Sequence, residues 1–147
     1  MEKLLNDDIL GQIRDVFQNM QHPVELALFV SQDNCDYCAE TQQLLGELAP
    51  LSDLLTLKVY DIHADADLAA KFGVSDTPAI LIMAREGEQM TDLGVRYLGI
   101  PSGHEFSTLI QDILLVSGRD SGLAPETRAY LKSLTSPLLL QVFVTPT

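Results

Sequence analysis

The chain has 147 residues, 46% of them hydrophobic, which is enough for one domain with a substantial core. Its formal net charge of −12 argues against nucleic-acid binding, and no apolar run approaches the length of a membrane span. The first residues include Glu2, Asp7 and Asp8 and lack the basic and apolar regions of a signal peptide, so we expect a cytoplasmic protein.

A helix and a strand are predicted at the start of the chain. Residues 8–20 carry one apolar stripe of an amphipathic helix, which consists of Ile9, Ile13, Val16, Phe17 and Met20. His22-Pro23 ends this helix. Residues 24–30, VELALFV, form an apolar run of the right length for a strand that is covered on both faces.

Two cysteines follow this strand in a CxxC motif. Residues 39–48 are rich in helix formers, so we expect Cys35 at a helix N-terminus and Cys38 one turn later. Unpaired N–H groups and the positive end of the helix dipole stabilise a thiolate there and lower its pKa below the free value of about 8.5. Cys35 is therefore predicted to be the exposed attacking sulfur, and Cys38 the shielded resolving one.

A close cysteine pair can serve either redox chemistry or a metal site. Structural disulfides are rare in the cytosol, so a pair there is more often redox-active or metal-binding. A structural zinc site needs about four nitrogen or sulfur ligands. The remaining candidates, His22, His63 and His104, show no ligand spacing to the pair. The sequence therefore favours a redox pair without a metal.

The middle of the chain predicts more strands. Residues 55–62 alternate well enough for a strand, which would lie parallel to the first after a right-handed crossover. A short helix is expected over residues 66–72. Pro78 stands directly before an apolar strand at residues 79–83, and residues 93–98 return as the second strand of a hairpin.

The sequence before the helix predicted to end near Gly118 contains an N-capping motif. Ser102 and Glu105 fit a capping box, in which the two residues satisfy each other's free backbone N–H groups. Apolar residues follow at helical spacing, and the helix is expected to end near Gly118.

The cysteine helix, Thr77-Pro78 before a strand, the hairpin and the closing helix occur together in one order that resembles the thioredoxin fold. Residues 23–38 and 94–106 are most similar to the first unit of the two-unit protein disulfide oxidoreductases, or glutaredoxin-like proteins, of thermophilic archaea and bacteria. This resemblance implies an α/β fold, with a central mixed sheet flanked by helices and a helix before the first core strand.

The resemblance also implies substrate-binding residues. Pro78 resembles the family's cis-proline that faces the dithiol, and Thr77 before it would present backbone groups to an extended substrate segment. Tyr37 matches an aromatic residue between the cysteines, which could form an apolar wall beside the sulfurs or simply pack on the helix. Gly99 resembles a glycine near the dithiol, where a side chain would block substrate approach.

Some positions leave the interpretation open. Thioredoxins have a buried acid on the central strand, and the matching position in this chain is close to Leu28, so that acid is absent. The sequence therefore does not identify the group that relays a proton to Cys38. Glu25 lies nearer the start of the same strand, where it can be a surface residue. Arg96 and Tyr97 belong to the family signature, and a unit–unit interface or a substrate contact explains them equally well.

An internal repeat divides the chain. The stretch at 23–31 recurs at 137–145, with a helical stretch before each, at 129–134 in the second case. By the same offset a second CxxC would begin just past Thr147. We therefore expect a thioredoxin-fold unit at residues 1–118, with residues 119–147 as the linker, helix and first strand of a truncated second unit.

The sequence thus predicts a thiol–disulfide oxidoreductase with the catalytic residues Cys35 and Cys38. Its expected partners are protein or small-molecule disulfides and an upstream thiol reductant, without a cofactor, metal, nucleic acid or membrane. A non-catalytic docking module and a CxxC metal-binding module are the alternatives. The apolar strand predicted at 138–144 lacks the rest of its unit, so we expect it to add to a sheet edge, such as the strand at 55–62, of the same chain or of another copy.

Overall fold

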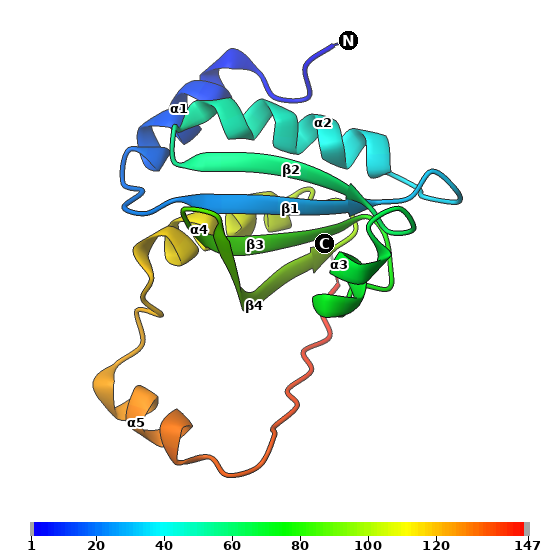
Figure 1. Ribbon diagram of the computed structural model, residues 1–147. Helices are drawn as coiled ribbons and strands as arrows, with labels where there is room; N and C mark the ends of the chain where they lie inside the picture. Colours follow the sequence, from blue (N-terminus) through cyan, green and yellow to red (C-terminus); the bar gives the residue numbers. More distant parts are fainter. Residues whose placement is uncertain (1, 146–147) are drawn as a thin grey trace.

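The computed structural model describes residues 2–145, and none of the helices in this range is long and apolar enough to cross a membrane. Figure 1 shows the elements in chain order. They are α1 (Asp7–Phe17), β1 (Val24–Val30), α2 (Cys38–Leu48), the 3₁₀ turn η1 (Ala49–Leu51), β2 (Leu55–Asp61), α3 (Ala66–Lys71), β3 (Ala79–Glu86), β4 (Gln89–Leu98), α4 (His104–Gly118) and α5 (Pro125–Ser133).

The strands form one mixed sheet in the order β2-β1-β3-β4. β1 is parallel to β2, as the crossover through α2 requires, and antiparallel to β3. β3 and β4 form the predicted antiparallel hairpin. β2 has no outer neighbour, as expected. Because β1 ends where β3 begins, the loop after β1 and the loop before β3 lie at the same end of the sheet.

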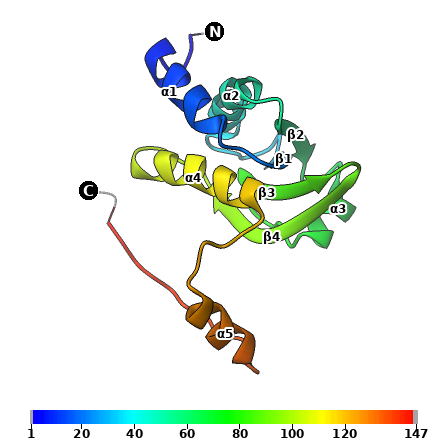
Figure 2. The same cartoon turned by 90° about the vertical axis from the view of Figure 1, so that its left-hand side faces the viewer.

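The two faces of the sheet are covered unequally. α1, α2 and α4 pack on one face around alternate β1 and β3 side chains such as Leu26, Leu28 and Ile82. The other face carries Ala27, Phe29 and the remaining β3 residues, with α3 as its helical cover. Figure 2 shows the same division, with α3 across the sheet from the other three helices. Both central strands are therefore buried on both sides, which explains their nearly continuous apolar sequences.

Glu25 is the one charged residue that lies fully inside this fold, with an exposed fraction of 0% in the described chain. Tyr60 donates a hydrogen bond to its carboxylate at 3.2 Å. Arg85 Nη1 and Lys58 Nζ lie 3.4 and 3.5 Å from its Oε2 atom. Burial and the Glu25 carboxylate raise the pKa of Tyr60 to about 12. The interpretation of Glu25 as a surface residue is wrong, because its neighbours on β2 and β3 reach over it on the thinly covered face.

The first helix is shorter than its sequence pattern suggests. α1 ends at Phe17 rather than Met20, and Met20 is buried from the following loop. Ile9 and Val16, predicted to lie on the buried stripe, are exposed at the border of the contact. Ile13 and Phe17 carry the packing of this helix.

The predicted capping box at the start of α4 does not form. Gly103 is the N-cap residue, and no side chain caps the helix. Its φ of +59° and ψ of −126° suit glycine, which has no Cβ. Ser102 therefore lies one residue too early for its hydroxyl to cap the helix, and its carbonyl accepts from the Glu105 N–H at 3.2 Å instead.

The C-terminal part contributes to neither core cluster. α5 begins at Pro125, buries no side chain and lies away from the sheet in both views (Figures 1 and 2). Residues 138–144 form no strand, and Phe143 is 89% exposed. The prediction that this stretch pairs with an edge of its own sheet is wrong, since β2 remains an outermost strand. A strand needs a neighbouring strand to pair with, and the sheet of the described residues consists of β2, β1, β3 and β4 alone.

We expect Glu25→Ala to lower the free energy of unfolding by about 3 kcal/mol, because it leaves Arg85 and the Tyr60 hydroxyl without their buried partner. Denaturant unfolding at neutral pH measures this loss. The exposed Glu86 is a control at the end of β3, and Glu86→Ala should change stability by less than about 0.5 kcal/mol. Equal, small losses in both variants would contradict a stabilising role for the buried carboxylate.

Candidate active site

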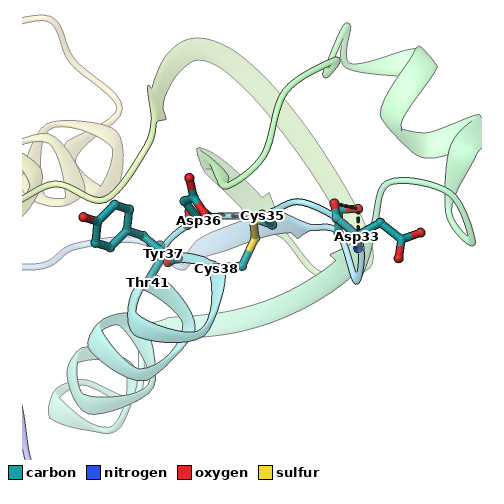
Figure 3. The surroundings of a disulfide bond; sticks show 7 residues. Asp33, Cys35, Asp36, Tyr37, Cys38 and Thr41 are labelled. Atoms are coloured by element: carbon teal, nitrogen blue, oxygen red, sulfur yellow. Dashed lines mark hydrogen bonds between the residues drawn. A yellow bond between two sulfur atoms is a disulfide. The ribbon is translucent and has the colours of Figure 1, made fainter.

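Cys35 and Cys38 form a disulfide where the loop after β1 meets α2 (Figure 3). Their Cα atoms are 5.6 Å apart. Cys38 is the first residue of α2 and is buried, whereas Cys35 lies in the loop and is half-buried. The difference in exposure between the two sulfurs is the one expected from the sequence, and it makes Cys35 the easier to reach from solvent.

The start of α2 corrects the predicted position of Cys35. The helix begins at Cys38, so Cys35 and Asp36 lie before it rather than in its first turn. Tyr37 has a φ of +66°, a left-handed conformation that cannot continue as a right-handed helix. The sequence pattern of good helix formers could not reveal this backbone turn.

Thr41 holds the turn and the helix together, and sequence analysis missed it. Both its N–H and its hydroxyl donate to the Tyr37 carbonyl, at 2.9 and 2.6 Å. Its side chain is fully buried, one helical turn after Cys38. The available signal was its position at helical spacing on the same stripe as Cys38, Leu44 and Leu48. Thr41 thereby holds the carbonyl of Tyr37, the second of the two residues between the cysteines.

The Thr77–Pro78 peptide bond is cis, as the resemblance implied. Pro78 is buried directly before β3, at the end of the sheet where β1 leads into the cysteine loop. Its carbonyl accepts from the Gly99 N–H at 2.9 Å. The structure thus brings Pro78, Gly99 and the disulfide to one end of the sheet.

Gly99 has a conformational reason to be glycine. Its φ is +95°, which side chains rarely tolerate, and nothing lies within 4 Å of the position that a Cβ would take. The chain itself therefore leaves open space there. The predicted role of this space in substrate approach stays a prediction.

Tyr37 lies in a different position from either sequence-based alternative. Its ring is 61% exposed and points away from the two sulfur atoms (Figure 3). It neither walls the disulfide nor packs on α2 in this conformation.

Arg96 and Tyr97, whose role the sequence left open, both bind inside the unit. Arg96 donates to the Phe72 carbonyl at 2.9 Å and pairs with Asp92. The Tyr97 hydroxyl donates to Asp112 at 2.6 Å and so ties β4 to α4. Burial and the Asp112 carboxylate raise the pKa of Tyr97.

The buried polar side chains in residues 2–145 are Glu25, Thr41 and Ser117. Leu28, near the thioredoxin acid position, is fully buried and apolar, and Glu25 lies at the opposite end of β1 from the cysteine loop. No described group of three or more His, Cys, Asp and Glu side chains could hold a metal ion. What the described geometry offers is a disulfide with one accessible sulfur.

Known proteins share this sequence and arrangement. No protein-family model matches the chain. It is 29% identical over 144 residues to the F component of alkyl hydroperoxide reductase from Staphylococcus epidermidis, and 28% identical to that of Staphylococcus aureus. Each alignment takes in 98% of this chain and 25% of the relative. The chain therefore spans about a quarter of the length of these curated relatives.

Solved structures give the fold. A protein disulfide oxidoreductase from Aeropyrum pernix matches with a TM-score of 0.76 and 31% identity, over 90% of this chain and 57% of that one. The alkyl hydroperoxide reductase component AhpF from Enterococcus faecalis matches with a TM-score of 0.78 and 21% identity, over 90% and 62% of the two chains. A thioredoxin from Thermus thermophilus matches with a TM-score of 0.52 and 18% identity, over 65% and 77%.

These comparisons confirm the predicted fold and the resemblance to protein disulfide oxidoreductases. The mixed sheet, the helix before β1 and the CxxC disulfide are found in one chain, in the expected order. The chain has a thioredoxin fold with a CxxC disulfide, and over 90% of its length it is similar to 57% of the Aeropyrum pernix protein disulfide oxidoreductase.

Proposed function

We propose that this chain is a thiol–disulfide oxidoreductase that exchanges disulfides with protein partners through Cys35 and Cys38. One observation carries the proposal: the two cysteines are bridged, and Cys35 in the loop is a more exposed residue than Cys38 in the helix. The similarity to the Aeropyrum pernix protein disulfide oxidoreductase supports the same chemistry.

The exchange starts from the reduced dithiol. The Cys35 thiolate attacks one sulfur of a substrate disulfide, so that a mixed disulfide forms and the other substrate sulfur leaves as a thiolate. The Cys38 thiolate then attacks Cys35 Sγ, which closes the internal disulfide and releases the second substrate thiol. Two electrons thereby pass to the substrate, and an upstream thiol reductant returns them to the pair.

Thr77 and Pro78 are proposed to hold an extended segment of the substrate. β3 begins at Ala79, so the backbone of Thr77 precedes the paired strand and can meet a partner by strand addition. Gly99 leaves open space beside this segment, and the exposed Tyr37 ring offers an apolar contact. Cysteines 35 and 38 remain the catalytic residues in this proposal, and the other four bind substrate.

The oxidoreductase and docking-module hypotheses differ in a simple assay. The reduced protein should accelerate the reduction of insulin disulfides by dithiothreitol, measured as turbidity, and Cys35→Ser should abolish the acceleration. Cys38→Ser should instead accumulate a mixed disulfide with insulin, visible on a non-reducing gel. If the unmodified chain does not accelerate insulin reduction, and so gives the same rate as Cys35→Ser, a module that binds without exchanging disulfides is favoured.

The order of attack predicts unequal alkylation. In the reduced protein, limiting iodoacetamide should modify Cys35 roughly tenfold faster than Cys38, because Cys38 is buried at the start of α2. Peptide mass spectrometry after digestion distinguishes the two sites. Preferential labelling of Cys38 would reverse the proposed roles of the two sulfurs.

We further propose that residues 1–118 form the thioredoxin-fold unit, and that residues 119–147 are the linker, helix and first strand of a second unit. The repeat of 23–31 at 137–145 supports this division. So do the absence of buried side chains in α5 and the exposure of 138–144, both within the described part of the chain. Alternatively, residues 138–144 pair with a sheet edge of a second copy of this chain.

Limited trypsin digestion tests the division. Lys132 is exposed on α5, and the Arg128 guanidinium on the same helix contacts Asp120 and Leu123 of the nearby linker. The Arg119 guanidinium instead donates to the carbonyls of Pro23 before β1, Arg85 in β3 and Val116 in α4. We expect the first cuts after Arg128 and Lys132, with a resistant product that retains the N-terminus. Mass spectrometry identifies the products. First cuts within β1 to β4 would contradict an independent unit at residues 1–118.

A further inference from the structure

Exposed carboxylates surround the disulfide. The segments 31–40, 72–78 and 98–103 meet at the end of the sheet where β1 ends, β3 begins and β4 ends. They carry Asp33, Asp36, Glu40 and Asp76, all exposed. Asp33 and Asp36 lie on either side of Cys35 along the loop (Figure 3). We call these three segments the disulfide face.

The charge of this face is not balanced by the chain. In the described residues, Asp33, Asp36, Glu40 and Asp76 have no ion-pair partner, and the Asp76 carboxylate accepts only from the Ser75 hydroxyl. The sequence has no Lys or Arg from residue 15 to 57, from 72 to 84 or from 97 to 118. Elsewhere, five lysines and arginines do pair with carboxylates.

One lysine is found at this end of the molecule. Lys71 lies on α3, at the same end of the sheet as the cysteine loop (Figure 1). Its ammonium is 5.3 Å from the centre of the Phe72 ring rather than beside a carboxylate. The Arg96 guanidinium also reaches this face, where it donates to the Phe72 carbonyl, but its charge is paired with Asp92. Lys71 alone does not offset the four carboxylates, so the face keeps a net negative charge.

The segments of the disulfide face also carry two large exposed apolar side chains. Tyr37 is 61% exposed and Leu98, at the end of β4, is 66% exposed. Exposed aromatic and aliphatic groups with a charged surround are typical of a protein contact surface rather than of a pocket for a small disulfide.

We propose that the disulfide face selects a protein partner that carries lysine or arginine residues next to its own reactive cysteine. This inference rests on the proposed function. Uncompensated carboxylates attract a cationic surface and speed its encounter, whereas an anionic disulfide is repelled. The partner's cations meet Asp33, Asp36 and Asp76, and an apolar side chain of the partner contacts Tyr37 and Leu98.

The test uses three disulfide-linked peptide dimers of equal length, whose single cysteine is flanked by two lysines, two serines or two glutamates. The reduced full-length chain is mixed with each, and the second-order rate constant of exchange is measured by stopped-flow at low and high salt. We expect the lysine dimer to react roughly tenfold faster than the glutamate dimer at about 20 mM salt, and less than twofold faster at about 500 mM.

Two variants with the same change in net charge locate the effect. The first is Asp33→Asn with Asp36→Asn and Asp76→Asn. The control is Asp53→Asn with Glu86→Gln and Glu88→Gln, all exposed at the opposite end of the sheet. The ratio of the lysine to the glutamate rate cancels any change in the reactivity of Cys35. This ratio should fall to about two in the first variant and stay near the unmodified value in the control.

The outcomes separate the two proposals. Exchange with the neutral serine dimer tests the proposed oxidoreductase function. If the serine dimer does not exchange, both that function and this inference are contradicted. If the serine dimer reacts, the ratio of the lysine-dimer to the glutamate-dimer rate is compared between the two variants. An equal ratio in both variants means that the net charge of the whole chain, and not the disulfide face, sets the preference, and the inference is overturned. A glutamate dimer that reacts as fast as the lysine dimer overturns it as well.

Discussion

The antiparallel pairing of β1 with β3 determines where chemistry can occur in this molecule. Phe29 lies opposite Ala79, so the chain leaves β1 toward the cysteines at the point where the cis-proline segment enters β3. The hydrogen bond from Gly99 to the Pro78 carbonyl adds the end of β4 to the same place. Residues far apart in the sequence thereby form one rim around the disulfide, and this rim rests on strands that are buried on both faces.

The cysteine loop makes the two sulfurs unequal. The left-handed Tyr37 stops the helix from starting before Cys38, and Thr41 secures its carbonyl with two hydrogen bonds. Cys38 consequently enters the packed layer of α2, while Cys35 stays in the loop and remains accessible. A pair of chemically identical thiols acquires distinct positions from one backbone turn, and the proposed division into attacking and resolving sulfur depends on that turn.

Polar contacts reinforce the unit where apolar cover is thin. Tyr60, Arg85 and Lys58 surround Glu25 on the face that α3 covers only in part. At the other side, the Ser117 hydroxyl binds backbone groups of Gln21 and His22, which joins the end of α4 to the segment before β1. Because an unpaired buried polar group costs about 1–3 kcal/mol, such networks favour one arrangement of the elements over its competitors.

The sequence by itself determined the CxxC motif and the type and order of the elements up to residue 118, because apolar periodicity, glycine and proline positions are local signals. The fold was predicted from the resemblance to the protein disulfide oxidoreductases. Strand β1 was predicted with its observed bounds, whereas the start of α2 was not, since the left-handed Tyr37 depends on a hydrogen bond from Thr41. Only the tertiary structure decided that Glu25 is buried, that Tyr37 points outward and that 138–144 joins no strand of the sheet in this chain. Each of these depends on which distant residues come to lie nearby, and a one-dimensional pattern carries no such information.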